Sequence, residues 1–367
     1  MKITAVRAES YALNQPAAIV TGDNAYAEMN FSIVRVETDE GVSGFGLLYA
    51  SNLPGGAETI KAFTAGLEPL LLGKHPFETE KHYATLYRPS MMGRRSLTTR
   101  IIGAVDLALH DIKGKALGQP LWRLLGGFRN SIPAYVAGGY YVQGKGLKEL
   151  AAEMESHLAF GANAVKMKIG RVSIKEDVER VRVVREAIGP DVKLMVDSNS
   201  AHTLPEATEF ARRIEPYEPY WFEDPLGADN YKGHRQLRAT TRITIATGEN
   251  EYTRYGFRDL IEHEAAQILC PDAQRMGGVT EFMKAAALCQ AHDIPIATHG
   301  NAEIHAQLAC AVPNGHIIEF YRQNSDPTWG YMFDEYLTLK DGAVHLSERP
   351  GFGVELNEDW LKRYRVA

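Results

Sequence analysis

The feature that most constrains the fold is a regular alternation of short apolar runs and amphipathic segments between about residues 132 and 320. The apolar runs have the length of strands, and the segments between them have helical periodicity. The predicted strands are 163–169, 192–197, 220–223, 243–247, 267–270, 294–298 and 316–320. Alternation at this pace predicts parallel βα units, about eight of them, and therefore a (β/α)₈ barrel.

The helical segments between these strands carry their own start signals. One has Leu147, Leu150, Met154 and Leu158 at spacings that place them on one helical face. Two others open with capping patterns, which are Ser173-x-x-Glu176 and Thr203-x-Pro205-Glu206. The alternative arrangement is an open doubly wound sheet. It is disfavoured because no G-x-G-x-x-G pattern opens the first βα turn.

The regions on either side of the alternation have a different texture. Residues 1 to about 50 alternate like antiparallel strands with a turn at Asp39-Glu40-Gly41, and 57–125 is helical in pattern up to Gly126-Gly127. We therefore predict an α/β chain with an α+β capping domain over residues 1–128, a barrel over 129–322, and a tail over 323–367 that returns to the cap.

Charged or titratable residues stand at the ends of successive predicted strands, 20 to 29 residues apart. In a barrel the carboxyl ends of the strands converge on one mouth, where active sites lie. A series that recurs at strand after strand is hard to reconcile with chance. Its members are Lys168, Asp197, Glu223, Glu249, Asp272, His299 and Glu319.

The first of these strands contains Lys166-Met167-Lys168. Side chains alternate along a strand, so Lys166 and Lys168 share a face and Met167 takes the other. In a barrel the lysines then point inward, where two like charges lower each other's pKa and favour a base that works near neutral pH. The alternative is a pair of surface lysines on an edge strand.

Three consecutive strand ends supply carboxylates, at Asp197, Glu223 and Glu249. A set of oxygen ligands without cysteine or histidine favours a hard cation, and near-octahedral Mg²⁺ fits best. Asp272 and His299 follow as a pair in which the aspartate holds one imidazole nitrogen and the other serves as base or acid. The alternative for each acid alone is a capping or turn residue. Glu319 lies between apolar residues, and we expect it to be held protonated as a hydrogen-bond donor.

Composition excludes several other classes of protein. The 367 residues carry a formal net charge of −6, and the lysines and arginines are scattered, so neither nucleic acid nor a membrane surface is an expected partner. Three cysteines in apolar surroundings are expected to be buried thiols in a reducing compartment. The N-terminus reads as a strand start rather than a signal peptide, and no apolar stretch has the length of a membrane span. The expected location is the cytoplasm.

These motifs resemble the mandelate racemase branch of the enolase superfamily over nearly the whole chain. The similar motifs are K-x-K at 166–168, V-D-x-N at 196–199, E-[DE]-P at 223–225, G-E-N at 248–250, D-A-x-x-x-G-G at 272–278, His299, Glu319 and a cap stretch at 104–127. His110 departs from the tryptophan that is common in the family and affects local packing alone.

The resemblance implies a role for each motif residue. It implies one Mg²⁺ per chain, held by Asp197, Glu223 and Glu249, with Lys168 as general base on one face of the substrate. It implies that Lys166 contacts the substrate carboxylate and lowers the pKa of Lys168. On the opposite face it places His299, oriented by Asp272, and it makes Glu319 a hydrogen-bond donor to the carboxylate. By the same analogy a homo-oligomer is expected.

The predicted chemistry is removal of the proton alpha to a carboxylate. The segments 20–26 and 49–52, with Arg94 and Arg95, are polar, which favours a polyhydroxy acid over an aromatic substrate. We therefore favour dehydration of a sugar acid to a 2-keto-3-deoxy acid. A racemase or epimerase of a 2-hydroxy acid is the main alternative; a cycloisomerase, another barrel enzyme that binds phosphate, and a non-catalytic binding protein are the others. Residues expected to contact substrate are Asn199, Tyr26, Tyr49 and Arg322.

Overall fold

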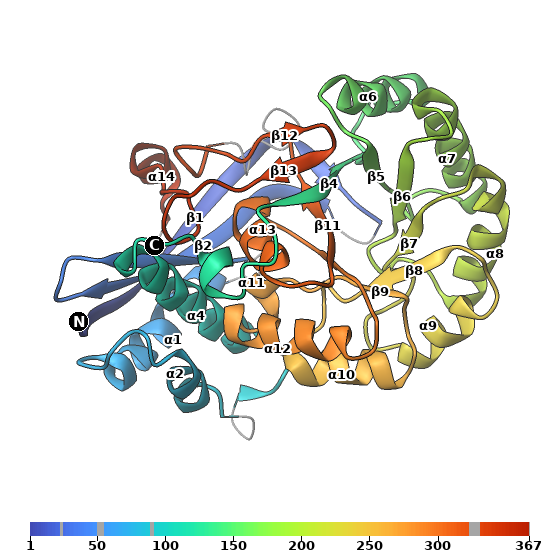
Figure 1. Ribbon diagram of the computed structural model, residues 1–367. Helices are drawn as coiled ribbons and strands as arrows, with labels where there is room; N and C mark the ends of the chain where they lie inside the picture. The colour runs from blue at the N-terminus through green and yellow to red at the C-terminus, as the bar shows by residue number, and fades with distance from the viewer. Residues whose placement is uncertain (23–24, 50–54, 89–91, 323–330, 367) are drawn as a thin grey trace.

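The computed structural model describes residues 1–22, 25–49, 55–88, 92–322 and 331–366, with the backbone alone at 14–19, 26 and 27. Figure 1 shows two parts, a ring of strands surrounded by helices and an N-terminal sheet with its own helices. The last segment of the chain returns from the ring to the N-terminal sheet, and both termini lie on that side of the molecule.

The N-terminal part is an antiparallel sheet covered by helices. Its strands are β1 (Ile3–Val20), β2 (Ala25–Thr38) and β3 (Ser43–Tyr49), and its helices are α1 (Gly56–Leu71), α2 (Thr79–Leu86), α4 (Leu97–Ala116) and α5 (Leu121–Leu124). Helix α4 packs on β3 because two glycines face it: a Cβ at Gly46 would lie 1.9 Å from the carbonyl oxygen of Ala104, and one at Gly44 would lie 2.2 Å from that of Ala108. Larger side chains at either position would force the helix away from the sheet.

Eight parallel strands form the barrel. They are β4 (Ser131–Gly138), β5 (Ala164–Lys168), β6 (Lys193–Asp197), β7 (Trp221–Glu223), β8 (Thr244–Thr247), β9 (Ile268–Leu269), β10 (Ile296–Thr298) and β11 (Gly315–Phe320). Each pairs with the next along the chain, and β11 pairs with β4 to close the ring. The closed barrel and the antiparallel cap confirm the predicted fold class.

The connecting helices surround the ring (Figure 1). They are α6 (Leu147–Ala159), α7 (Ile174–Ile188), α8 (Leu204–Ile214), the 3₁₀ helix η1 (Glu215–Tyr217), α9 (Tyr231–Arg238), α10 (Thr253–Glu262), α11 (Ala273–Met276), α12 (Gly278–Gln290) and α13 (Ala302–Ala311). The predicted capping box at the start of α7 is present, because the Ser173 hydroxyl accepts from Glu176 N and the Glu176 carboxylate accepts from Ser173 N.

The tail contacts both parts of the molecule. It contains β12 (Leu339–Lys340), β13 (Ala343–His345) and α14 (Glu358–Tyr364). Strand β13 pairs antiparallel with β4, whereas α14 lies against β1 and stacks Trp360 on Phe31. Among the described residues after β11, α14 is the one helix, and it packs on the cap instead of on the barrel.

Strand β5 shows how the sequence alternation places the lysines. Val165 and Met167 are buried in the apolar layer between strands and helices. Ala164 belongs to a separate apolar cluster that fills the closed end of the barrel. Lys166 and Lys168, on the same face as Ala164, point into the barrel above that cluster and are buried. The interior reading of the K-x-K motif is therefore confirmed.

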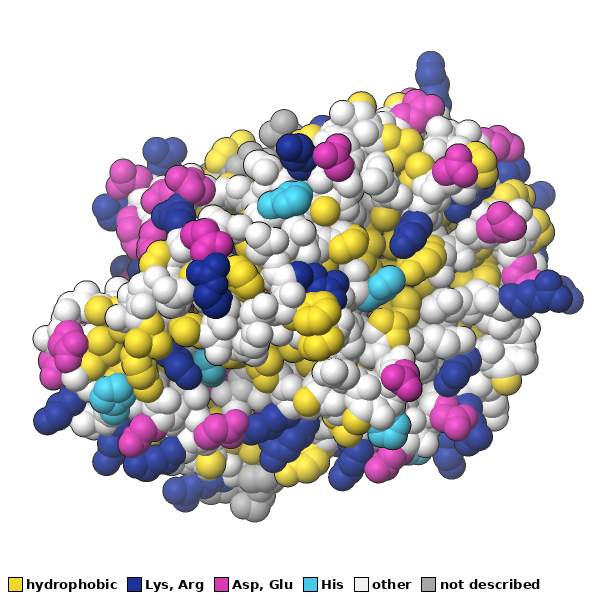
Figure 2. All heavy atoms as spheres, in the orientation of Figure 1, with side chains coloured by type: hydrophobic (Ala, Val, Ile, Leu, Met, Phe, Trp, Pro, Cys, Tyr) yellow, Lys and Arg dark blue, Asp and Glu magenta, His cyan; other side chains and the backbone are white. Residues whose placement is uncertain are grey.

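The buried thiols agree with the expectation from composition. On the face shown in Figure 2, acidic and basic side chains are interspersed. All three cysteines are buried and unpaired. In the part of the chain that the structure describes, no helix combines the length and the apolar character that a membrane crossing requires.

Arginines of the cap dock it onto the barrel. Arg94 donates to Asp259 at 2.6 Å. Arg95 makes a two-pronged ion pair with the buried carboxylate of Glu251. We expected Arg94 and Arg95 to be polar partners of a substrate; the structure instead places both guanidinium groups against the barrel, where they hold the two domains together.

Candidate active site

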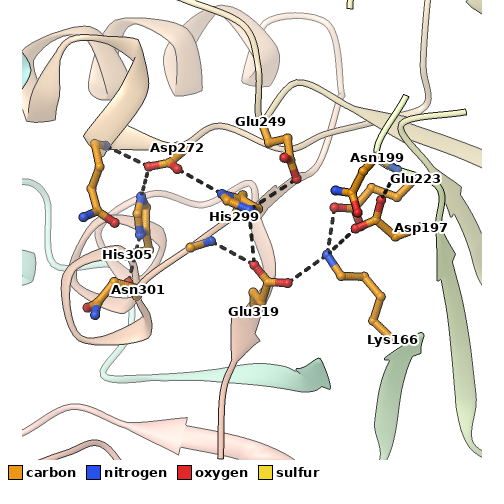
Figure 3. Close-up of polar contacts among 12 residues, drawn as sticks. Lys166, Asp197, Asn199, Glu223, Glu249, Asp272, His299, Asn301, His305 and Glu319 are labelled. Carbon is orange, nitrogen blue, oxygen red and sulfur yellow. Dashed lines mark hydrogen bonds and ion pairs between the residues drawn. The ribbon is translucent and has the colours of Figure 1, made fainter. Parts of the chain in front are cut away.

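The predicted series converges at the carboxyl-terminal mouth of the barrel (Figure 3). Lys168, Asp197 and Glu223 are the last residues of β5, β6 and β7. The others follow or end the next strands around the ring: Glu249 after β8, Asp272 after β9, His299 after β10 and Glu319 within β11. Parallel strands that end at one edge therefore bring distant parts of the sequence together.

The three carboxylates expected to hold a metal form one cluster. Asp197, Glu223 and Glu249 each offer an oxygen, and these oxygens lie within 4.8 Å of one another. All three side chains are buried. Burial together with the nearby Asp197 and Glu249 carboxylates raises the pKa of Glu223 to about 8, against the opposing effect of Lys166. The cluster therefore holds its full negative charge only at an electrostatic cost that a cation would remove.

The donor set and its charge fit a divalent cation. Oε2 of Glu249 is buried and accepts no hydrogen bond from the described residues, so it is available as a ligand. At the mouth, six carboxyl groups, including that of Asp224, lie around the basic side chains of Lys166, Lys168 and Arg275, so acidic groups outnumber basic ones. Oxygen ligands of this number and charge suit Mg²⁺.

The two lysines contact the same carboxylates. Lys166 Nζ lies 2.8 Å from both Glu223 and Glu319 and 3.4 Å from Asp197. Lys168 Nζ donates to Asp197 at 2.5 Å. Burial and Lys166 lower the pKa of Lys168, but the carboxylates of Asp197, Glu249 and Glu319 together outweigh them, so the pKa lies above its ordinary value. Lys166 therefore lowers the pKa of Lys168, as expected. The net pKa of Lys168 is nevertheless raised, so the expected shift toward neutral pH is not found.

His299 and Asp272 form the predicted dyad. His299 Nδ1 lies 2.9 Å from Asp272 Oδ2, and its Nε2 lies 3.3 Å from Glu249 Oε2 (Figure 3). The imidazole therefore has one nitrogen held and the other directed at the carboxylate cluster. Burial lowers the pKa of His299, yet Glu249, Glu319 and the hydrogen bond with Asp272 together raise it more, so that it lies above its ordinary value. His305 has the structural role expected of it, because its ring nitrogens bond Ala273 N and Asn301 O.

Glu319 differs from its expected protonation state. Its carboxylate accepts from Gly300 N at 2.9 Å and pairs with Lys166 at 2.8 Å. Burial opposes ionisation, but Lys166 and His299 outweigh it and hold the pKa of Glu319 well below its ordinary value. The expected protonated donor is therefore wrong for this structure: Glu319 is a carboxylate that orients Lys166 and the turn after His299.

The four residues expected to contact substrate are placed differently. Asn199 lies beside the cluster, where its backbone N donates to Asp197 at 2.9 Å and its buried Oδ1 accepts no hydrogen bond from the described residues. Tyr49 reaches the mouth from the cap and donates to Gln274 at 3.2 Å. The side chain of Tyr26 lies outside the described residues. Arg322 is directed away from the carboxylates, because its guanidinium donates to Ser156 on α6, so a contact with substrate is not supported for it.

Sequence reasoning missed two residues at the mouth, Arg275 and Tyr135, whereas Asp224 belongs to the E-[DE]-P motif. Arg275 pairs with Glu249 at 3.2 Å and with Asp272 at 3.3 Å. Asp224 accepts from Thr247, and burial with its carboxylate neighbours raises its pKa to about 7. Tyr135 on β4 lies 3.2 Å from Lys166 Nζ. Tyr135 stands on the inward side of its strand, which the alternation could have indicated; Arg275 occupies a variable place of the D-A-x-x-x-G-G motif and carried no separate signal.

Comparison with known proteins supports the family resemblance. Residues 2–126 match the mandelate racemase/muconate lactonizing enzyme N-terminal domain, and residues 149–360 match the enolase C-terminal domain-like family. The chain is 34% identical over 367 residues to 3,6-anhydro-alpha-L-galactonate cycloisomerase of Streptomyces coelicolor, which covers 99% of each chain. It is 31% identical to arabinonate dehydratase of Saccharolobus solfataricus, over 92% of this chain and 91% of that one.

Solved structures give the same result. A racemase from Streptomyces coelicolor with bound magnesium superposes with a TM-score of 0.92 at 31% identity, over 99% of this chain and 100% of that one. L-Talarate/galactarate dehydratase from Salmonella typhimurium, liganded with Mg and L-lyxarohydroxamate, also has a TM-score of 0.92, at 29% identity over 100% of this chain and 93% of that one. With both domains matched and the strand-end series assembled at one mouth, the chain belongs to the mandelate racemase/muconate lactonizing enzyme family of the enolase superfamily.

Proposed function

We propose that this chain is an Mg²⁺-dependent enzyme that removes the proton alpha to the carboxylate of a sugar acid and dehydrates the acid to a 2-keto-3-deoxy product. The main support for this proposal is that two proton-transfer groups lie on either side of a buried carboxylate cluster. Lys168 contacts the cluster at Asp197, and His299 contacts it at Glu249. Their strands, β5 and β10, are separated by β4 and β11 on one side of the ring and by β6–β9 on the other.

Removal of an alpha proton is difficult because the product carries a second negative charge beside the carboxylate. Asp197, Glu223 and Glu249 would hold Mg²⁺, which when bound would supply positive charge next to the developing enediolate. Lys166, enclosed among the same acids, adds an ammonium group that can bind the substrate carboxylate. Such groups are effective because they are buried and already oriented before the reaction begins.

The proton transfers follow from the positions of the two bases. Lys168, in its neutral form, takes the alpha proton as the C–H bond breaks, and the electron pair moves into the enediolate. Collapse of the enediolate expels the 3-hydroxyl, which takes the proton on His299 Nε2 and leaves as water. Asp272 keeps the His299 ring in the orientation that directs Nε2 at the reacting groups. The resulting enol becomes the 2-keto-3-deoxy acid by tautomerisation.

The named relatives support a sugar acid as substrate and keep two other reactions open. Relatives that are 29–31% identical are dehydratases of arabinonate, L-talarate/galactarate, D-xylonate and D-galactonate. The relative at 34% identity is a cycloisomerase of an anhydro sugar acid, which favours cycloisomerisation as the second candidate. The same two bases would also suit racemisation, the activity named for one solved relative.

The proposal is tested by incubating the Mg²⁺-loaded protein with a panel of aldonic and aldaric acids, anhydro acids and mandelate, and identifying the products. Dehydration predicts a 2-keto-3-deoxy acid from at least one sugar acid. Lys168→Ala and His299→Asn should each abolish product formation while Mg²⁺ still binds, because neither residue belongs to the carboxylate cluster. Full activity in either variant would refute the assigned roles. A ring-opened product from an anhydro acid alone would favour the cycloisomerase.

A further inference from the structure

Arg275 lies between the two halves of the site. It sits in the short helix α11, three residues after Asp272, and 17% of its side-chain surface is exposed. One nitrogen, Nη1, donates to the carboxylate and to the backbone oxygen of Glu249, at 3.2 and 3.3 Å, and to Asn250 Oδ1 at 2.7 Å. Nε of the same group lies 3.3 Å from Asp272 Oδ2.

These contacts have a directional consequence for Glu249. The guanidinium engages Oε1, whereas Oε2 has no hydrogen-bond partner among the described residues. Oε2 is also the oxygen that faces His299 Nε2, at 3.3 Å. The contact with the backbone oxygen of Glu249 further fixes the guanidinium beside this carboxylate. Arg275 thus selects which carboxylate oxygen is turned toward the cluster and which is held back.

The same guanidinium also bears on the proton-transfer dyad. Asp272 Oδ2 is the oxygen that His299 Nδ1 contacts at 2.9 Å, and Arg275 Nε lies 3.3 Å from it without making a hydrogen bond. A planar, permanently charged fork can contact Glu249 and Asp272 at once, whereas a lysine ammonium is a single point of charge on a flexible stem.

We propose that Arg275 is a positioning residue that presents Glu249 to the metal through one oxygen. The inference rests on the proposed function, because it assumes that the cluster binds Mg²⁺.

The test is calorimetric titration of the intact protein with Mg²⁺ alone, without substrate. Arg275→Lys keeps the charge and removes the fork, so the Kd for Mg²⁺ should rise about 10- to 100-fold, the range measured for groups that orient metal ligands. Arg35→Lys is the matched control: Arg35 pairs with Glu9 and Glu358 in the cap, far along the chain from the mouth, and should leave the Kd unchanged.

The direction in which a second variant changes the Kd for Mg²⁺ distinguishes positioning by Arg275 from a simple effect of its charge. If Arg275 acted only as a positive charge near the cation, Arg275→Met would tighten Mg²⁺ binding by removing repulsion. Positioning predicts weaker binding in this variant also. A Kd for Arg275→Lys within twofold of the unsubstituted protein, or tighter binding by Arg275→Met, would overturn the inference with the proposed function intact. Absence of Mg²⁺ binding by the unsubstituted protein would instead overturn the proposed function itself.

Discussion

The ion pair between Arg95 and Glu251 gives a quantitative test of how the cap is held on the barrel. The Glu251 side chain is 2% exposed and accepts from Arg95 Nε at 3.2 Å and from Arg95 Nη2. It also accepts from the Tyr231 hydroxyl at 2.5 Å and from Tyr252 N at 2.8 Å. Arg95→Met would therefore leave a buried carboxylate with two hydrogen bonds and without its principal countercharge.

The expected loss follows from these remaining contacts. Stranding one member of a buried ion pair costs about 3–5 kcal/mol. Two retained hydrogen bonds and the 23% exposure of Arg95 reduce this, and we expect Arg95→Met to lower the free energy of unfolding by about 2 kcal/mol. Arg7→Met, which breaks the exposed pair with Glu37, should cost no more than about 0.5 kcal/mol.

The assay is urea unfolding followed by circular dichroism, with both variants measured beside the unsubstituted protein. Arg95→Met combined with Glu251→Gln should recover part of the loss, because a neutral side chain no longer strands a charge. Two results would contradict this role: the same free energy of unfolding for Arg95→Met and Arg7→Met, or a double variant that is less stable than Arg95→Met. In either case the Arg95–Glu251 pair does not hold the cap on the barrel.

Three further predictions concern the metal and the cap. Mg²⁺ at about 100 times its Kd should stabilise the protein by about 2.7 kcal/mol, and Asp197→Asn should remove this gain in thermal unfolding. The folded-state pKa of Glu223, about 8, exceeds its unfolded value of 4.5, so its stabilising contribution is complete below 4.5 and is lost as pH rises through 8. In chelator the Tm should therefore fall from about pH 6 to about pH 9, with the largest Mg²⁺ effect at the alkaline end; a Tm that rises over this range contradicts the assignment. Gly46→Ala places a Cβ 1.9 Å from the Ala104 carbonyl and should cost about 3 kcal/mol in urea unfolding, whereas Gly66→Ala, on an open face of α1, should stabilise by about 0.5 kcal/mol.

Local periodicity explains why so much of the fold was predictable. The side-chain period of two sends Lys166 and Lys168 to one face of β5, and a closed ring of parallel strands brings their ends together whatever the loop lengths. For the same reason Asp197, Glu223 and Glu249 could be assigned to one cluster before their distances were known.

What could not be predicted depends on contacts between distant segments. Arg94 and Arg95 are polar residues of the cap. Nothing in the sequence around them indicates that they pair with Asp259 and Glu251 of the barrel. Arg322 follows Glu319 by three residues, yet the course of the chain after β11 carries its side chain to α6.

Protonation states were the least predictable feature of the site. Glu319 lies between apolar residues in the sequence, which favours a raised pKa. The structure adds Lys166 and His299 as neighbours, and their charges reverse the direction of the shift. A pKa is set by the sum of burial and all nearby charges, and only the first of these can be read from a short stretch of sequence.

The measurement that tests the central claim most directly is exchange of the alpha proton of sugar acids in D₂O, followed by ¹H NMR with the Mg²⁺-loaded protein. We expect loss of the alpha-proton signal for at least one acid, with a 2-keto-3-deoxy product, and no exchange in the Lys168→Ala, His299→Asn double variant. Turnover of an acid whose alpha proton is retained from substrate to product, or exchange that persists in the double variant, would contradict the central claim.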